Sequence, residues 1–231
     1  MILEEKISND FLLKEIKENA DKPINFFWLG RQEYLSCWDL QKSVHGMRKE
    51  NLINDVVLLV EHDHVYTLGK NANSLNILPH NKFDVKIVHN DRGGDVTYHG
   101  PGQIVGYPIV NLNNYKKSIT WYMRALELVI SKTFSYYNLE TTFKEGITGV
   151  WVGNNKIAAM GVRMSRWITM HGFAINLYPE MKYYNGLIPC GLHEYGVTSL
   201  ENEIKRKCNM DDFIGKLKYD FIDYFQSHKV K

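Results

Sequence analysis

The chain lacks the long apolar runs, the excess of one charge and the basic tails that are typical of membrane and nucleic-acid-binding proteins. No apolar stretch approaches the roughly 20 residues that span a bilayer. Its 28 basic and 26 acidic side chains leave a net charge of +2, and no array of aromatic residues lies among the lysines and arginines. Residues 1–22 are charged throughout and lack the apolar core of a signal peptide. We therefore expect no membrane span and no nucleic-acid partner.

Cysteine is also scarce in this sequence. The three cysteines, Cys37, Cys190 and Cys208, are an odd number without metal-type spacing, which favours free thiols in a reducing compartment. His62 and His64 lie at strand spacing and could face the same side, but no set of Cys and His partners accompanies them. We therefore expect a cytoplasmic protein without a metal site.

The apolar pattern predicts one α+β domain, a mixed sheet flanked by helices. With 44% hydrophobic residues the chain can bury a sizeable core, and no linker rich in Pro, Gly or Ser divides it. We expect an N-terminal extension over residues 1–22 and a single domain over residues 23–231. The pattern predicts helices over 10–20, 32–50, 118–137 and about 211–225, and strands over 25–29, 56–60, 64–68, 85–89, 104–110, 149–152, 156–164 and 167–177.

The segments between these elements contain specific turn and cap signals. Ser118 is the expected N-cap of the third helix. A Gly-rich turn is expected over 92–102 and a loop over 183–195. Residues Gly153 to Asn155 predict a hairpin turn one residue longer than the commonest type.

Cys190 lies between Pro189 and Gly191 in the predicted loop, a position that can expose a thiol beside backbone N–H groups. The alternative is a buried structural cysteine, and we expect that role for Cys37 and Cys208. A nucleophilic thiol needs a partner that favours the thiolate. The candidates are His99, His171, His193 and Lys156. By itself, a lysine beside a hairpin turn is typical of solvated surface.

The segment from Arg92 to Gln103 concentrates Gly, Pro and polar residues between two predicted strands. Its backbone amides could surround a ligand, although a purely structural turn is the alternative. No Gly-Lys-Ser/Thr follows, so the segment is not a P-loop, and it lacks the spacing of a dinucleotide-binding motif.

Six segments, taken in order, resemble the lipoyl(octanoyl) transferase family. The resemblance covers about residues 27–200, with no departure at the catalytic positions, and residues 1–22 match nothing in it. The segments are Glu61 to Gly69, Arg92 to Gln103 with Tyr107-Pro108, Thr148 to Trp151, Lys156 to Ala158, His171 to Asn176, and Ile188 to Gly191.

This resemblance implies a fold similar to the catalytic domain of biotin and lipoate protein ligases. It implies that Cys190 is the acyl-thioester nucleophile and that Lys156 tunes the thiol and transfers protons. The implied substrate-binding residues are Arg92, Gly93, Gly94, Asp95, Val96, Thr97, Tyr98, His99, Ala159, Met160, Gly161, His171, Gly172 and Phe173. Amides of Gly93 and Gly94, or amides near Gly191, are candidates for holding the oxyanion.

The implied reaction is the transfer of an octanoyl group, without ATP or metal, as the first step of protein lipoylation. The donor is octanoyl-acyl carrier protein, which carries the acyl group on its phosphopantetheine. The acceptors are lysines of lipoyl domains in oxo-acid dehydrogenase subunits and in the glycine cleavage H protein.

Four other functions remain open at this point. One is an ATP-dependent lipoate ligase on the same fold, although the loop from Gly93 to Gly100 differs from the triple-glycine form of the ligases. The second is an octanoyl amidotransferase that passes the chain between two lipoyl domains. The third is a thiol hydrolase that uses Cys190 with His99 or His171. The fourth is a non-catalytic protein that binds lipoyl domains or acyl groups.

Overall fold

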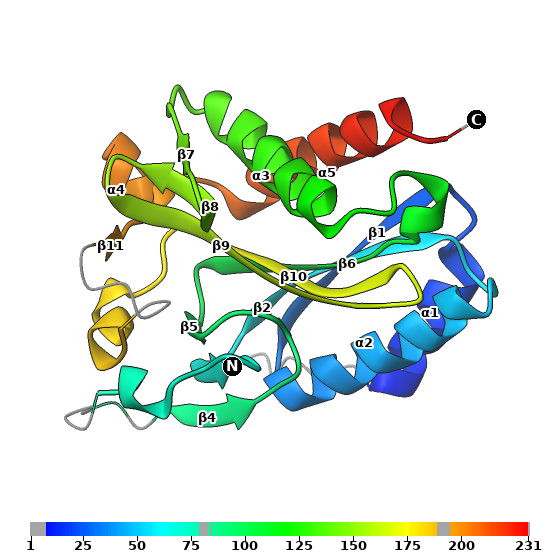
Figure 1. Ribbon diagram of the computed structural model, residues 1–231, viewed down its shortest axis with the longest axis horizontal. Helices are drawn as coiled ribbons and strands as arrows, with labels where there is room; N and C mark the ends of the chain where they lie inside the picture. Colours follow the sequence, from blue (N-terminus) through cyan, green and yellow to red (C-terminus); the bar gives the residue numbers. More distant parts are fainter. Residues whose placement is uncertain (1–7, 79–82, 84, 189–194, 231) are drawn as a thin grey trace, which may run out of the picture.

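Two β-sheets and the helices around them form the part of the chain that the computed structural model describes, residues 8–78, 83, 85–188 and 195–230. Figure 1 shows the main sheet between two layers of helices, with the smaller sheet below it. Within these residues the main sheet has eight strands, β1 (Ile24–Gln32), β2 (Asp55–His62), β6 (Gln103–Ile109), β10 (Ile168–Asn176), β9 (Asn155–Ser165), β8 (Ile147–Val152) and β7 (Thr142–Lys144) in spatial order, with β11 (Gly196–Val197) paired to β9. The small sheet is ordered β4 (Lys86–His89), β3 (Val65–Leu68), β5 (Val96–His99).

Both sheets are mixed, because parallel and antiparallel pairs occur side by side. The pairs β1–β2, β3–β4 and β9–β11 are parallel, and the other pairs are antiparallel. The strand β2, which lies next to the edge strand β1, reads Val-Val-Leu-Leu-Val over 56–60 and is buried along this run. A continuous apolar run of this length is typical of a strand covered on both faces. The predicted α+β fold class is confirmed.

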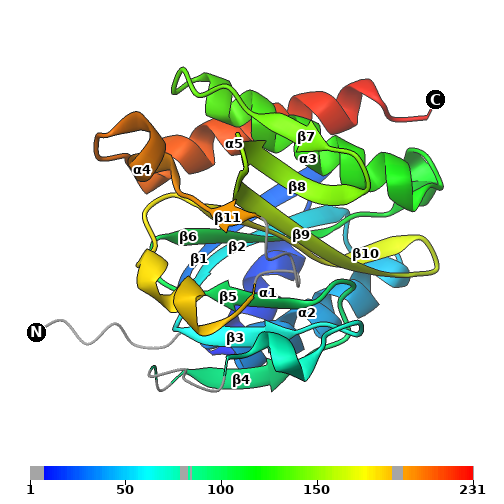
Figure 2. The ribbon, with the colours of Figure 1, turned by 60° about the vertical axis from the view of Figure 1, so that its left-hand side comes forward.

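The helices cover the two faces of the main sheet, as Figures 1 and 2 show. On one face α3 and α5 pack with the sheet into the larger core, and on the other α1 and α2 pack into the second core. The helices are α1 (Asn9–Asn19), α2 (Tyr34–Lys49), α3 (Ile119–Ser135), α4 (Leu200–Ile204) and α5 (Met210–Ser227), with short 3₁₀ helices η1 (Ser74–Asn76), η2 (Leu112–Asn114) and η3 (Met181–Gly186). Among the residues described, no helix is long and apolar enough to cross a membrane.

The long helices begin and end within a few residues of the predicted positions. The Ser118 hydroxyl accepts a hydrogen bond from the Trp121 amide at 3.2 Å, which confirms the predicted N-cap of α3. The helix inside the predicted N-terminal extension, α1, buries Leu12 and Ile16 in the second core. Residues 9–19 therefore pack against the domain, and the boundary at residue 22 stays a prediction.

Three sequence-based expectations need correction. The Gly-rich turn over 92–102 contains a strand, β5, which pairs with β3 and buries Val96 and Tyr98. The hairpin between β8 and β9 has a two-residue loop, Gly153 and Asn154, because Val152 pairs with Asn155. The loop expected over 183–195 begins inside η3, which ends at Gly186. The remainder of that loop, 189–194, lies outside the described residues.

Candidate active site

A pocket lies between the segment from Arg92 to Gln103, called here the Gly-rich segment and including β5, and the strands β6, β9 and β10. The predicted binding residues come together here: all of them except Gly93 and Tyr98 line the pocket. The lining residues are Tyr34, Arg92, Gly94, Asp95, Val96, Thr97, His99, Val105, Tyr107, Ala159, Met160, Gly161, His171, Gly172, Phe173 and Ala174. That these residues bind substrate remains a prediction.

Arg92 fastens the Gly-rich segment to the small sheet. Its Nη2 donates to the carbonyl oxygen of Thr67 at 2.7 Å, to the hydroxyl of Thr67 at 3.0 Å and to the carbonyl oxygen of Asp95 at 2.7 Å. Its Nη1 donates to the Gly93 carbonyl oxygen at 3.1 Å. The guanidinium, which is buried, therefore fixes both the start of the Gly-rich segment and its approach to β3.

The Gly-rich segment also lies directly on β9. The Gly93 amide donates to the Val162 carbonyl oxygen at 2.9 Å, so this amide is already occupied. A Cβ at Gly161 would lie only 2.8 Å from the Gly93 carbonyl oxygen. Glycine at 161 is therefore required by the close approach of two backbones, which brings the two predicted binding segments into one wall.

His99 is held as a neutral ring with an unprotonated Nε2. The Gln103 amide nitrogen donates to Asn176 Oδ1 at 2.9 Å and to the Tyr98 carbonyl oxygen at 3.1 Å. Its Oε1 therefore faces His99 Nδ1, at 2.7 Å, so we assign the proton to Nδ1. Burial, together with the nearby His62 ring, lowers the pKa of His99 to about 3. The Nε2 lone pair, 3.5 Å from Thr67 Oγ1, can accept a proton or a hydrogen bond.

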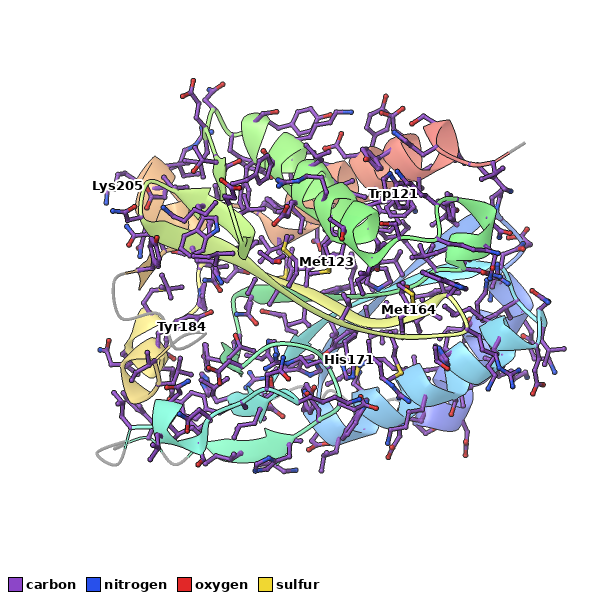
Figure 3. All side chains as sticks on the ribbon, viewed as in Figure 1. Trp121, Met123, Met164, His171, Tyr184 and Lys205 are labelled. Carbon is purple, nitrogen blue, oxygen red and sulfur yellow. The ribbon has the colours of Figure 1, made fainter. Side chains whose placement is uncertain are left out.

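His171 enters the pocket from β10 with an unusual backbone conformation. Its φ of 56° is in the left-handed region, which few non-glycine residues adopt. Its Nε2 lies 2.7 Å from Asp91 Oδ1, and Asp91 also pairs with Arg163. Burial lowers the pKa of His171 to about 4. Its Nδ1 is buried and has no hydrogen-bond partner among the described residues. Figure 3 shows His171 on the side of β10 that faces α2 and the small sheet.

Lys156 lies on β9, outside the residues that line the pocket but on the same strand as Ala159 and Gly161. Only 7% of the residue is exposed, so the expectation of a solvated surface lysine is wrong. Its Nζ lies 4.8 Å from the centre of the Trp151 ring, and Trp151 packs edge-on against Tyr195 at 5.2 Å. A cation over a buried indole ring is a favourable arrangement. It offsets part of the free-energy cost of removing the Lys156 ammonium from water.

Two of the three cysteines are described, and neither is an activated thiol. Burial raises the pKa of Cys37 to about 12 and the pKa of Cys208 to about 11. The structural role expected for both agrees with these environments. Cys190 and His193 lie outside the described residues.

His62 and His64 have separate surroundings and do not form a pair. His62 contacts the Gln32 carbonyl oxygen at 2.8 Å and the Tyr107 hydroxyl at 2.6 Å, whereas His64 contacts the Tyr98 hydroxyl at 2.8 Å. In the described part of the chain no group of three or more His, Cys, Asp or Glu side chains is placed to hold a metal ion.

Four pocket residues were not among the predicted binding residues. They are Tyr34, Val105, Tyr107 and Ala174. Tyr34 belongs to the apolar stripe of α2, and Tyr107 is part of a segment that carries the family resemblance. Apolar periodicity identifies both as core residues, but only the packing of α2 and β6 under the pocket shows that they reach its wall.

Comparisons with known proteins show the family to which the chain belongs. The family model "Lipoyl protein ligase A/B catalytic domain" matches residues 33–222. An octanoyltransferase of Clostridium kluyveri is 41% identical over 197 residues, which cover 84% of this chain and 84% of that protein. An octanoyltransferase of Flavobacterium johnsoniae is 41% identical over 231 residues, which cover 91% of this chain and all of that protein.

Solved structures with the same fold are more distant in sequence. A putative lipoate protein ligase of T. acidophilum superposes with a TM-score of 0.69 at 13% identity, covering 87% of this chain and 85% of that one. A biotin protein ligase of Aquifex aeolicus superposes with a TM-score of 0.53 at 11% identity, covering 88% and 69%. These structures confirm the predicted likeness of fold. The family match and the identity to its relatives show that the chain belongs to the lipoyl protein ligase A/B catalytic domain family, that its relatives there are octanoyltransferases, and that it is an acyltransferase.

Proposed function

We propose that this protein transfers an octanoyl group from octanoyl-acyl carrier protein, through a thioester on Cys190, to a lysine of a lipoyl domain. The observation that carries the proposal is the pocket, in which the Gly-rich segment, β9 and β10 meet. These are the segments by which the sequence resembles octanoyl transferases, and the relatives named octanoyltransferase match most of the chain.

The wall of the pocket suits a hydrocarbon chain. Val105, Met160 and Phe173 contribute apolar side chains, and the small residues beside them leave room between the strands. Each methylene moved from water into such a pocket contributes about 0.8 kcal/mol. An eight-carbon chain would therefore bind much more tightly than a chain of two or four carbons.

The proposed chemistry has two acyl-transfer steps. In the first, the Cys190 thiolate attacks the octanoyl thioester, the bond to the phosphopantetheine sulfur breaks, and the carrier leaves as a thiol. In the second, the ε-amine of the acceptor lysine loses a proton and attacks the Cys190 thioester, which forms an amide and releases the Cys190 thiol. One thioester replaces another in the first step and an amide replaces a thioester in the second, so no ATP is required.

Lys156 is the proposed partner of the thiol. A cationic lysine near a thiol favours the thiolate, and the buried position of Lys156 strengthens such an interaction. Lys156 or His99 is the proposed acceptor for the proton of the acceptor amine. His99 offers the lone pair of Nε2, since its proton lies on Nδ1, but burial makes this ring a weak base. The Gly93 amide is occupied by Val162, which leaves the Gly94 amide and amides near Gly191 as candidate oxyanion donors.

The acceptor is proposed to be a lipoyl domain of an oxo-acid dehydrogenase subunit or the glycine cleavage H protein, in the cytoplasm. One solved relative of the fold, at 12% identity and a TM-score of 0.66, is described as a bipartite lipoate protein ligase from Thermoplasma acidophilum and its E2 lipoyl domain. The ligases of this fold make an ATP-dependent lipoate ligase the second candidate.

The test is an intact-mass measurement after the protein is mixed with octanoyl-acyl carrier protein without ATP, followed by addition of a lipoyl domain. We expect one octanoyl increment on the peptide that contains Cys190, and then its transfer to the lysine of the domain. Cys190→Ser should abolish both signals, whereas the control Cys208→Ser should retain them, because that thiol has a raised pKa.

Modification of the domain only in the presence of ATP and free octanoate would refute the proposal in favour of the ligase. Release of free octanoate without transfer would identify a hydrolase. Binding of the domain without any covalent adduct, unaffected by Cys190→Ser, would identify a non-catalytic binding protein. Octanoyl transfer between two lipoyl domains, but not from the carrier protein, would identify an amidotransferase.

A further inference from the structure

A buried carboxylate on α3 lies next to the strand that precedes Lys156, outside the pocket. Glu127 is 5% exposed, although a glutamate is seldom buried without a partner. Its neighbours on the same helix, Leu126 and Ile130, belong to the larger core. Met123, one turn earlier on the same face, lies between α3 and the main sheet in Figure 3. Glu127 therefore points toward the sheet, where a charge must be compensated.

Both carboxylate oxygens of Glu127 are used. Oε1 accepts a hydrogen bond from the Gly149 amide at 2.8 Å, and Oε2 pairs with Arg124 Nη1 at 2.9 Å. The Arg124 side chain is 48% exposed, so its pairing contributes little by itself. The bond to the buried Gly149 amide is therefore the contact that fixes the carboxylate to the sheet.

Gly149 lies in β8 but is not paired with a residue of either described neighbouring strand. Within the described strands, β8 pairs with β9 from Val150 onward, with a shift of register between Val150 and Trp151, and Gly149 has no register partner. Its φ of 146° lies in a region that other residues rarely adopt. Without Glu127 the amide of Gly149 would lose this acceptor, and an unsatisfied buried donor is unfavourable.

The Lys156 side chain packs over this glycine. A Cβ at Gly149 would lie 3.1 Å from Lys156 Cε and 3.2 Å from Trp151 Nε1, so the missing side chain makes the space that the lysine stem occupies. The Lys156 ammonium then reaches the face of the Trp151 ring. A shift of the Gly149 backbone would therefore move the surface on which Lys156 rests.

We propose that Glu127 is a positioning residue that holds Gly149, and through it the Lys156 side chain, in the geometry that acyl transfer needs. The inference rests on the proposed function, in which Lys156 tunes the Cys190 thiol. Glu127 does not contact substrate, and its effect reaches the reaction only through the backbone of β8.

The test is the pH dependence of Cys190 alkylation by iodoacetamide, followed by mass spectrometry of the Cys190 peptide in the full chain. Glu127→Met removes the acceptor for the Gly149 amide and should shift the alkylation midpoint upward by about 0.5–1 pH unit, because a displaced cation stabilises the thiolate less. Glu127→Gln keeps a side-chain oxygen that can accept the bond, and should behave as the unmodified protein. Arg124→Gln, which leaves the bond to Gly149 in place, is the matched control.

Lys156→Met is measured in parallel to separate two failures. If Lys156→Met shifts the midpoint and Glu127→Met does not, the positioning role is refuted while the proposed function stands. If Lys156→Met causes no shift, the role of Lys156 fails and the inference fails with it. If Glu127→Gln shifts the midpoint upward as much as Glu127→Met, a retained side-chain acceptor does not preserve the geometry, and the inference is again refuted.

A buried substitution can also unfold a protein, so circular dichroism is recorded for each variant. Should Glu127→Met fail to fold, Glu127→Asp replaces it, since aspartate keeps the charge but withdraws the carboxylate by one methylene. The same upward shift is expected for Glu127→Asp, and an unchanged midpoint would refute the inference.

Discussion

Arg92 illustrates how one side chain can define the pocket wall. Its guanidinium donates to oxygens of Thr67, Asp95 and Gly93, which belong to β3 and to the start of the Gly-rich segment. A lysine ammonium carries the same charge but is a single point on a flexible stem. Position 92 therefore requires the planar guanidinium of arginine, which can donate to several oxygens at once.

Replacing Arg92 with lysine should lower the free energy of unfolding by about 1–3 kcal/mol, since buried carbonyl oxygens lose their donors. It should also raise the KM for the proposed donor, octanoyl-acyl carrier protein, because the Gly-rich segment lines the pocket. Urea denaturation and steady-state kinetics measure the two effects. Arg31→Lys is the control, because Arg31 makes an exposed ion pair with Asp63 that contributes less than about 1 kcal/mol. Equal effects of the two substitutions would contradict this role for Arg92.

At the scale of elements, three neighbouring strands place Gly106, Phe173 and Met160 in one row across the main sheet. The Phe173 ring lies over Gly106, where a Cβ would be only 2.1 Å from the ring. Phe173 and Met160 both line the pocket. The absence of a side chain on β6 therefore determines where the aromatic wall of the pocket can lie.

Gly106→Ala should force the Phe173 ring to move and should lower the free energy of unfolding by about 1–3 kcal/mol, the usual cost of overpacking. The displaced ring should also slow formation of the acyl-enzyme, which rapid-quench mass spectrometry measures. The matched control is Gly46→Ala in α2, where the new methyl group meets no atom within 4 Å. That control should stabilise the protein by about 0.5–1 kcal/mol. A Gly106→Ala variant as stable and as fast as the original protein would show that the ring position is not constrained.

At the scale of the whole molecule, three buried histidines from different strands gather between the two sheets. His62 ends β2, His99 ends β5, and His171 lies in β10. The His62 ring lies 5.9 Å from that of His99. Burial lowers the pKa of His62 and of His171 to about 4, and the pKa of His99 to about 3. All three are therefore neutral in the folded protein near neutral pH.

The unfolded chain binds protons at these histidines below about pH 6.5, whereas the folded protein does not. The free energy of unfolding should therefore be highest above pH 6.5 and should fall as the pH decreases toward 4, by up to about 1.4 kcal/mol per pH unit for each histidine. Chemical denaturation at several pH values between 7 and 5 measures the slope. His99→Gln should reduce the slope by about one proton. A slope that does not change in His99→Gln would contradict the assignment of a neutral, buried ring.

Sequence alone determined the features that local chemistry encodes. The helices α2, α3 and α5 repeat apolar residues at helical spacing, Ser118 caps a helix that begins at the next residue, and the run over 56–60 fits a covered strand. The six ordered segments also identified the family, because a motif is a local arrangement of residue types. The short elements β5, β7, β11 and α4 were not predicted, because they lack a clear apolar pattern of their own and are stabilised by their neighbours.

Tertiary structure decided which of these residues are buried and which meet. A lysine beside a turn is ordinarily solvated, yet Lys156 is covered because Trp151 and Gly149 pack around its stem. Tyr34 and Tyr107 reach the pocket only because α2 and β6 lie beneath the Gly-rich segment. Glu127 accepts a hydrogen bond from the amide of Gly149, which lies 22 residues later in the sequence. Whether a side chain is buried, and which groups it contacts, depends on residues far away in the sequence. Those contacts exist only once the chain has folded.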